Sequence, residues 1–157
     1  MHTKHRSQND KYNMIVFTDA SKYPGQNPTG SIVYRLFTPG YNDIGLKKKH
    51  YCFSNIPVWE AEAKLIIKGL ELFKNSCGGV DNIVFFCDSV RALRSMKRNI
   101  EYLNLKRYFA NQGVNIILKK VKAHSNSKLN NIADGEAKKA FVIKSEKRKS
   151  NGLIYIK

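Results

Sequence analysis

The sequence M-I-V-F-T-D-A-S, from Met14 to Ser21, is a short apolar run that ends on a carboxylate. Its β-branched and aromatic residues predict a central strand that carries Asp19 at its carboxyl end. Side chains alternate along a strand, so Asp19 shares a face with Ile15 and Phe17, which favour burial. A buried carboxylate is costly unless a cation or hydrogen-bond donors compensate it. The segment therefore predicts a compensated acid at the edge of a sheet.

Two more strands and a helix are predicted next. The strands run from Ser31 to Phe37 and from Leu46 to Phe53, and the segment P-G-Y-N-D between them is rich in turn residues. Three successive strands with short loops form an antiparallel meander. At Pro57 the pattern changes to helical periodicity, which continues to a stop between Asn75 and Gly79.

Two acids of this helix are predicted to have different surroundings. At about 100° per residue, Glu60 falls on the polar face together with Lys64. Glu62 falls on the opposite face, in line with Leu65 and Ile66. We therefore expect Glu62 to point at the sheet and Glu60 to point into solvent.

The second half of the chain predicts parallel strands. The run from Asn82 to Asp88 is almost continuously apolar, as in a strand buried on both faces, and a helical crossover makes it parallel to the first strand. The remaining predicted elements are helices over Ser89–Arg98 and Glu101–Gln112, a strand over Val114–Val121, and a helix from about Leu129 to Lys144 that carries Asp134. The predicted fold is α/β, with a mixed five-stranded sheet, three antiparallel strands followed by parallel ones, flanked by helices.

The charge of the chain restricts the class of partner. Its 157 residues include 28 Lys and Arg against 12 Asp and Glu, a formal net charge of +16. Such an excess favours a polyanion, most often nucleic acid. An anionic membrane surface is the weaker alternative, because no long basic amphipathic helix is apparent. No apolar run approaches the roughly 20 residues that span a bilayer, so we expect no membrane segment.

The predicted organisation is one domain with two polar ends. Residues 1–12 are expected to form a disordered basic arm without a secretory signal, 13–144 the catalytic domain, and 145–157 a basic tail. The sequence leaves open whether Leu153–Ile156 adds a strand or stays mobile. The three cysteines form no C-x-x-C pair, which favours a reducing, intracellular, cytoplasmic location. We expect a monomer.

Four acids are placed where they can meet. Asp19 and Asp88 each end a strand, and the carboxyl edge of parallel strands is where active sites gather. Glu62 and Asp134, each near the start of a helix, can converge on that edge. Four carboxylates so close repel one another unless divalent cations lie among them. Oxygen ligands favour Mg²⁺, with Mn²⁺ as a possible substitute, and two such ions about 4 Å apart form a clamp for displacement at phosphorus.

The ordered set of motifs resembles the type 1 ribonucleases H. The matching segments are F-T-D-A-S at Phe17–Ser21, A-E-A-K-L-I-I-K-G-L-E at Ala61–Glu71, C-D-S at Cys87–Ser89, and K-A-H…N-N-I-A-D-G-E-A at Lys122–Ala137. The order Asp, Glu, Asp, His, Asp and the ten-residue step from His124 to Asp134 also agree with that family.

The resemblance implies a function and a role for each residue. It implies endonucleolytic cleavage of the RNA strand of RNA/DNA hybrids, leaving 5′-phosphate and 3′-hydroxyl ends, with two metal ions per site when substrate is bound. Asp19 would bridge both ions, and Asp134 would help to hold the ion that activates water. Glu62 and Asp88 would hold the ion at the departing 3′ oxygen. His124 would assist proton movement or product release. RNA would be selected through its 2′-hydroxyls.

Several positions depart from the family's pattern. Ala20 stands where Gly is frequent, Val58–Ala61 reads V-W-E-A where adjacent Asn residues are common, and Val90 replaces a polar residue. The short step from Asp88 to His124 indicates that a basic handle helix is missing. Its electrostatic role would fall to the N-terminal arm, to Lys47–Lys49, and to Arg91, Arg94 and Arg98, which share one helical face.

These departures keep two alternatives open. One is a nuclease of the same fold that cuts another nucleic acid, and the other is a non-catalytic nucleic-acid-binding domain. Taken singly, each acid also has an ordinary explanation, such as a strand-end turn or a helix entry. The presence of all four in order favours the enzyme.

Overall fold

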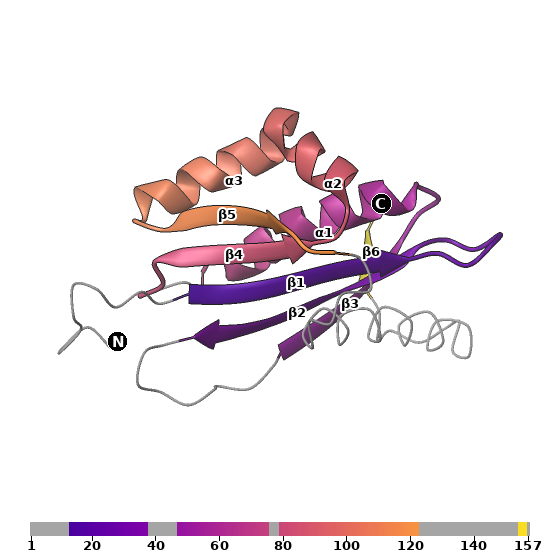
Figure 1. Ribbon diagram of the computed structural model, residues 1–157, viewed down its shortest axis with the longest axis horizontal. Helices are drawn as coiled ribbons and strands as arrows, with labels where there is room; N and C mark the ends of the chain where they lie inside the picture. The colour runs from indigo at the N-terminus through magenta and orange to yellow at the C-terminus, as the bar shows by residue number, and fades with distance from the viewer. Residues whose placement is uncertain (1–12, 38–46, 76–78, 123–153, 157) are drawn as a thin grey trace.

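The described part of the chain folds into one mixed β-sheet with its helices α1, α2 and α3 on one face (Figure 1). The computed structural model describes residues 13–37, 47–75, 79–122 and 154–156. The described sheet has six strands in the order β5-β4-β1-β2-β3-β6. Their bounds are β1 Asn13–Ser21, β2 Thr29–Phe37, β3 Lys47–Phe53, β4 Asn82–Cys87, β5 Asn115–Lys120 and β6 Ile154–Ile156.

The predicted fold class is confirmed for its five strands. β1, β2 and β3 form the antiparallel meander, and β4 and β5 continue the sheet in parallel from β1. The strand left open by the sequence is present, since β6 pairs in parallel with β3 from Tyr51 to Phe53. The sheet therefore extends one strand beyond the five predicted.

The helices also lie near their predicted positions. α1 spans Val58–Phe73, and the segment predicted as one helix from Ser89 is α2, Val90–Ser95, followed by the 3₁₀ turn η1, Met96–Arg98. The Ser89 side chain accepts a hydrogen bond from the backbone N–H of Ala92 at 3.1 Å and so caps the start of α2. α3 spans Ile100–Asn111. The arm 1–12, the predicted helix 129–144, and the boundary at 144 lie outside the described residues. No helix of the described part is long and apolar enough to cross a bilayer.

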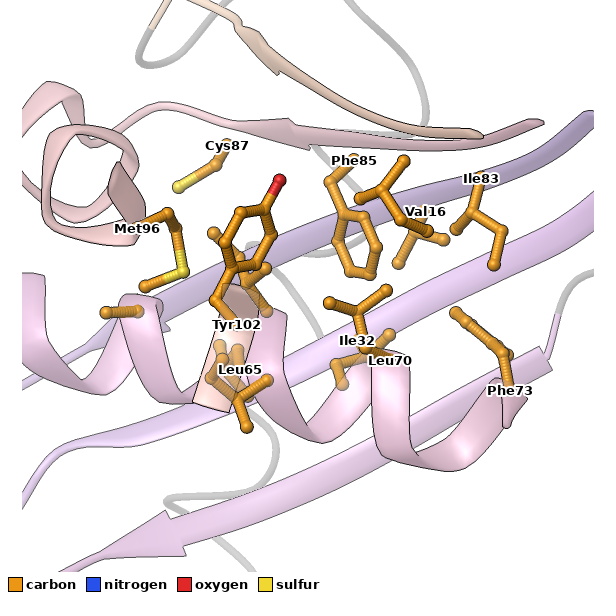
Figure 2. Packing of buried hydrophobic residues seen from close by; sticks show 14 of the residues in the cluster. Val16, Ile32, Leu65, Leu70, Phe73, Ile83, Phe85, Cys87, Met96 and Tyr102 are labelled. Atoms are coloured by element: carbon orange, nitrogen blue, oxygen red, sulfur yellow. The ribbon is translucent and has the colours of Figure 1, made fainter. Parts of the chain in front are cut away.

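The main core lies between the sheet and the three helices (Figure 2). Val16, Ile32 and Phe85 of the sheet pack against Leu65 and other apolar residues of α1. On the opposite face a smaller cluster is centred on Phe17 and Val33. Both faces of β1 are therefore buried, which explains why its sequence is apolar at consecutive positions rather than alternating.

Asparagines align the amino ends of the parallel strands. Asn82 donates a side-chain hydrogen bond to Asn13 at 2.8 Å, and Asn115 donates one to Asn82 at 3.4 Å. The three residues are direct partners in the β1–β4 and β4–β5 registers. A slip of one residue would move each strand's side chains to the wrong face. The asparagine ladder thus supports the register that aligns the strands' other ends.

α1 approaches the sheet most closely at Gly69. A Cβ atom there would lie 2.8 Å from Cε2 and 3.0 Å from Cζ of the Phe85 ring. Phe85 is fully buried and cannot move aside freely. Glycine therefore allows α1 to pack closely on the sheet at this point.

We expect Gly69→Ala to destabilise the chain despite the higher helix propensity of alanine. Overpacking costs about 1–3 kcal/mol, and the gain in propensity offsets at most about 1 kcal/mol. The free energy of unfolding, measured with urea, tests this. Lys68→Ala on the exposed side of the same helix is the control, with an expected change within about 0.5 kcal/mol. A Gly69→Ala chain as stable as the control would show that the contact is not restrictive.

Candidate active site

Two of the predicted site acids lie at the same edge of the sheet. β1 and β4 are parallel, and Phe17 pairs with Phe86, so Asp19 and Asp88 lie at the same level two residues further along. Alternation puts both on the face of the Phe17 and Phe86 rings, which stack with centroids 4.9 Å apart. Asp19 is only 6% exposed, and Asp88 is half-buried. Both carboxyl groups are thus held at the carboxyl edge of the sheet.

Glu62 reaches this edge from α1. It lies in the helix's second turn, and its side chain is 2% exposed, as expected from its position on the apolar face. The backbone N–H of Ala20, next to Asp19 on β1, donates to Glu62 Oε1 at 3.3 Å. Glu60 differs from the prediction, since it is half-buried rather than fully in solvent. It borders a mixed-charge pocket between α1 and the start of α3.

Cys87 is part of the same cluster, although it was not predicted as a site residue. Its thiol donates to Glu62 Oε2 at 3.7 Å, and the side chain is fully buried. One ligand atom each from Glu62, Cys87 and Asp88 all lie within 4.8 Å of one another. The signal in the sequence was its position: it directly precedes Asp88 and, by alternation, faces the helices. Cys87 and Met96 belong to the same core cluster, and Figure 2 shows both toward one end of it.

Burial and the neighbouring acids raise the cost of ionising Glu62. Burial, the negative charge of Asp88, a hydrogen bond with the Asp88 side chain and the negative charge of Asp19 together raise the pKa of Glu62 to about 9, against the opposing hydrogen bond from the Ala20 N–H. Burial and the nearby Glu62 carboxylate raise the pKa of the Cys87 thiol to about 12. With protein groups alone, the favoured form of the cluster at neutral pH has a protonated Glu62.

The donor set fits a hard divalent cation. A cation among these oxygens would remove the repulsion that raises the pKa of Glu62. The Cys87 thiol keeps its proton and donates a hydrogen bond to Glu62. The groups left to bind a cation are therefore carboxylate oxygens. Oxygen ligation favours Mg²⁺ or Mn²⁺ over Zn²⁺.

The remaining predicted residues are not placed. His124 and Asp134 lie outside the described residues, so their relation to the cluster stays a prediction. Of the four predicted acids, the structure brings Glu62 and Asp88 into one cluster and puts Asp19 close enough to act on Glu62 electrostatically. A cavity of about 540 Å³ between α2, α3 and β5 is lined by none of these acids.

Comparison with solved structures identifies the architecture. The ribonuclease H1 of the archaeon Halobacterium salinarum superposes with a TM-score of 0.54 at 16% identity, over 83% of this chain and 98% of that one. LC11 ribonuclease H1, from a compost metagenome and solved with an RNA/DNA hybrid, gives 0.54 at 15% identity, over 82% and 99%. This chain has the ribonuclease H fold.

A viral ribonuclease H domain has the same fold. The domain from prototype foamy virus gives a TM-score of 0.51 at 13% identity, over 83% of this chain and 92% of that one. No protein-family model and no curated protein matches this sequence. The fold that the motif resemblance predicted is therefore confirmed. Sequence identities of 13–16% to these structures support the fold alone and not an activity.

The raised pKa of Glu62 makes stability depend on pH. The folded chain keeps this proton up to about pH 9, whereas the unfolded chain releases it near the ordinary value of 4.5. Without divalent cations, we therefore expect the free energy of unfolding to fall as pH rises between these values. Glu62→Gln, which cannot ionise, should lose much of this slope and be more stable at pH 8, by on the order of a few kcal/mol.

Urea unfolding of both chains from pH 5 to pH 9, in EDTA and in Mg²⁺, measures this effect. Mg²⁺ should raise the stability of the unchanged chain at pH 8 and have little effect on Glu62→Gln. Glu60→Gln removes a carboxyl group of the same helix outside the cluster and should keep the slope of the unchanged chain. Equal slopes for all three chains would mean that Glu62 ionises as freely as a surface acid.

Proposed function

We propose that this protein is a metal-dependent endoribonuclease that hydrolyses the RNA strand of RNA/DNA hybrids by a two-metal mechanism. The observation that carries the proposal is the convergence of Glu62 and Asp88, with Asp19 alongside, at the carboxyl edge of β1 and β4 within the ribonuclease H fold. Buried acids that repel one another lower stability, and divalent cations supplied with a phosphate substrate would offset that cost. The net charge of +16 supports a polyanionic substrate.

The proposed reaction is in-line displacement at phosphorus. A water oxygen bonds to phosphorus, the bond from phosphorus to the 3′ oxygen breaks, and a proton passes to the departing oxygen, leaving 5′-phosphate and 3′-hydroxyl ends. Bound divalent ions would supply activation of the water and neutralisation of the developing charge. Asp19, Glu62 and Asp88 would hold them, together with Asp134 as the sequence predicts, and His124 would assist proton movement.

The groups around Glu62 have positioning roles in this proposal. The Ala20 N–H and the Cys87 thiol bind one carboxylate oxygen each, so the side chain is held in one orientation before a cation or substrate arrives. A ligand held in place loses little conformational freedom on binding, which favours tight and well-oriented coordination.

A cleavage assay separates the proposal from its alternatives. The purified chain is incubated with Mg²⁺, Mn²⁺ or Ca²⁺ and with labelled RNA/DNA hybrid, double-stranded RNA, single-stranded RNA or duplex DNA. We expect cutting of the hybrid with Mg²⁺ or Mn²⁺. Asp19→Asn and Glu62→Gln should lower the rate by roughly 10²-fold or more, because each removes a ligand worth several kcal/mol in the transition state.

Glu60→Gln is the matched control, because it removes an acid of the same helix outside the cluster, and its rate should stay close to that of the unchanged chain. Cutting of another polymer instead of the hybrid would select a nuclease of different specificity, the alternative raised by V-W-E-A at Val58–Ala61. Tight binding without turnover in any metal would select the non-catalytic alternative.

A further inference from the structure

A basic pocket lies on the surface where the start of α1 meets α2 and η1. It is an open pocket of about 430 Å³ lined by Trp59, Arg91, Arg94, Ser95, Lys97 and Arg98, which we call the Trp59 pocket. Four of these six residues are cationic and none is acidic. Within the described part of the chain, these four cations form no salt bridge. The pocket therefore concentrates positive charge that no salt bridge among the described residues neutralises.

The pocket is attached to the elements that carry the site acids. Trp59 lies in the first turn of α1, one helical turn before Glu62, and Arg91 follows Asp88 by three residues. The Arg91 guanidinium carbon lies 4.3 Å from the centroid of the Trp59 ring, so α1 and α2 meet through this contact. The start of α1 therefore sets the position of Trp59 relative to Glu62, and the start of α2 sets the position of Arg91 relative to Asp88.

The stacking leaves the guanidinium able to bind another group. A cation–π contact uses the flat face of the guanidinium, while its N–H donors lie in the plane and point away from the ring. Arg91 is exposed and Trp59 is half-buried, so both the donors and part of the indole are open to a ligand. Planar N–H donors beside an aromatic face suit a phosphate next to a sugar or base.

The surroundings indicate from which side such a ligand would approach. A neighbouring pocket of about 370 Å³ shares Trp59 and Ser95 but also contains Glu60, Glu71 and Glu101. Those acids disfavour phosphate, although lysines partly offset them. A polyanion would therefore lie on the Arg91 side of the indole, toward Arg94 and Arg98.

We propose that the Trp59 pocket binds the phosphodiester backbone of the nucleic acid beside the cleavage site, with Arg91, Arg94 and Arg98 contacting phosphates and Trp59 packing against a sugar or base. This inference rests on the proposed function for the identity of the ligand. It adds a specific binding site to the general attraction that the net charge provides.

Trp59 is the only tryptophan of the chain, so tryptophan fluorescence reports on the surroundings of this one side chain. The test uses the full chain with Asp19→Asn, which prevents cleavage, and a 12-base-pair RNA/DNA hybrid carrying a fluorescent label. Binding is followed by label anisotropy at several NaCl concentrations and, in parallel, by Trp59 emission with unlabelled hybrid. We expect a saturable change in Trp59 emission at the concentration that saturates anisotropy.

Charge variants test the binding of phosphates by the arginines. Arg91→Ala combined with Arg94→Ala should weaken binding and make the slope of log affinity against log salt shallower, by about 0.9 for each phosphate that the variant no longer neutralises. Arg91→Lys with Arg94→Lys should restore most of the slope, because the charges return. Lys74→Ala is the matched control, since Lys74 stacks 4.8 Å from the Tyr108 ring at the far end of α1. It should leave the slope unchanged, and thermal unfolding verifies that every variant folds.

Two results would overturn the inference: an unchanged Trp59 emission when anisotropy shows saturation, or an equal salt slope for the double alanine variant and Lys74→Ala. Absence of hybrid binding would overturn it as well. Hydrolysis is read separately with the unchanged Asp19. Binding through the pocket without cleavage would refute the proposed function and support the pocket as a binding site. Cleavage of the hybrid with an unaltered salt slope in the double alanine variant would support the proposed function and refute the pocket.

Discussion

The Glu62 carboxylate, buried next to two other acids at the end of the sheet, is the group on which the rest of the site depends. It is held by one backbone N–H from β1 and one thiol from β4, so its position requires that both strands end at the same level. That level follows from the parallel register, which the asparagine ladder supports at the other end of the strands. It also requires α1 to lie close to the sheet, which the absence of a side chain at Gly69 allows.

Much of this arrangement could be predicted from the sequence because it depends on local periodicity. The alternation around Asp19, the continuous apolar run before Asp88 and the helical spacing of Glu62 each follow from the neighbouring residues. The parallel pairing of β1 with β4 follows from the helical crossover between them. The order of the elements along the chain and the periodicity of their apolar residues were therefore sufficient to predict the five-stranded sheet and the direction of the Glu62 side chain.

Other features depend on contacts between distant residues, for which local patterns carry no signal. β6 pairs with β3 although about 100 residues separate them, and three apolar residues in a charged tail do not specify a partner. The Cys87 thiol donates to an acid on another element, and a cysteine in an apolar strand is usually a packing residue. The Trp59–Arg91 contact likewise joins two helices whose approach is set by the sheet beneath them.

The cations of the Trp59 pocket and the acids of the cluster lie on neighbouring segments of the chain, so under the proposed function their charges affect the binding of both metal and substrate. The cationic pocket would attract a phosphate backbone, whereas the ionised acids of the cluster would repel it unless cations neutralise them. Metal and substrate should therefore bind with positive coupling, because each lowers the electrostatic cost of the other. Since Glu62 lies on α1 with Trp59 and Asp88 shortly precedes α2 with Arg91, a nucleic acid bound in the pocket would present its backbone to these acids with little movement of the protein. Affinity and chemistry would then depend on neighbouring residues, with the basic side chains holding the strand and the buried carboxylates acting only once their charge has been neutralised.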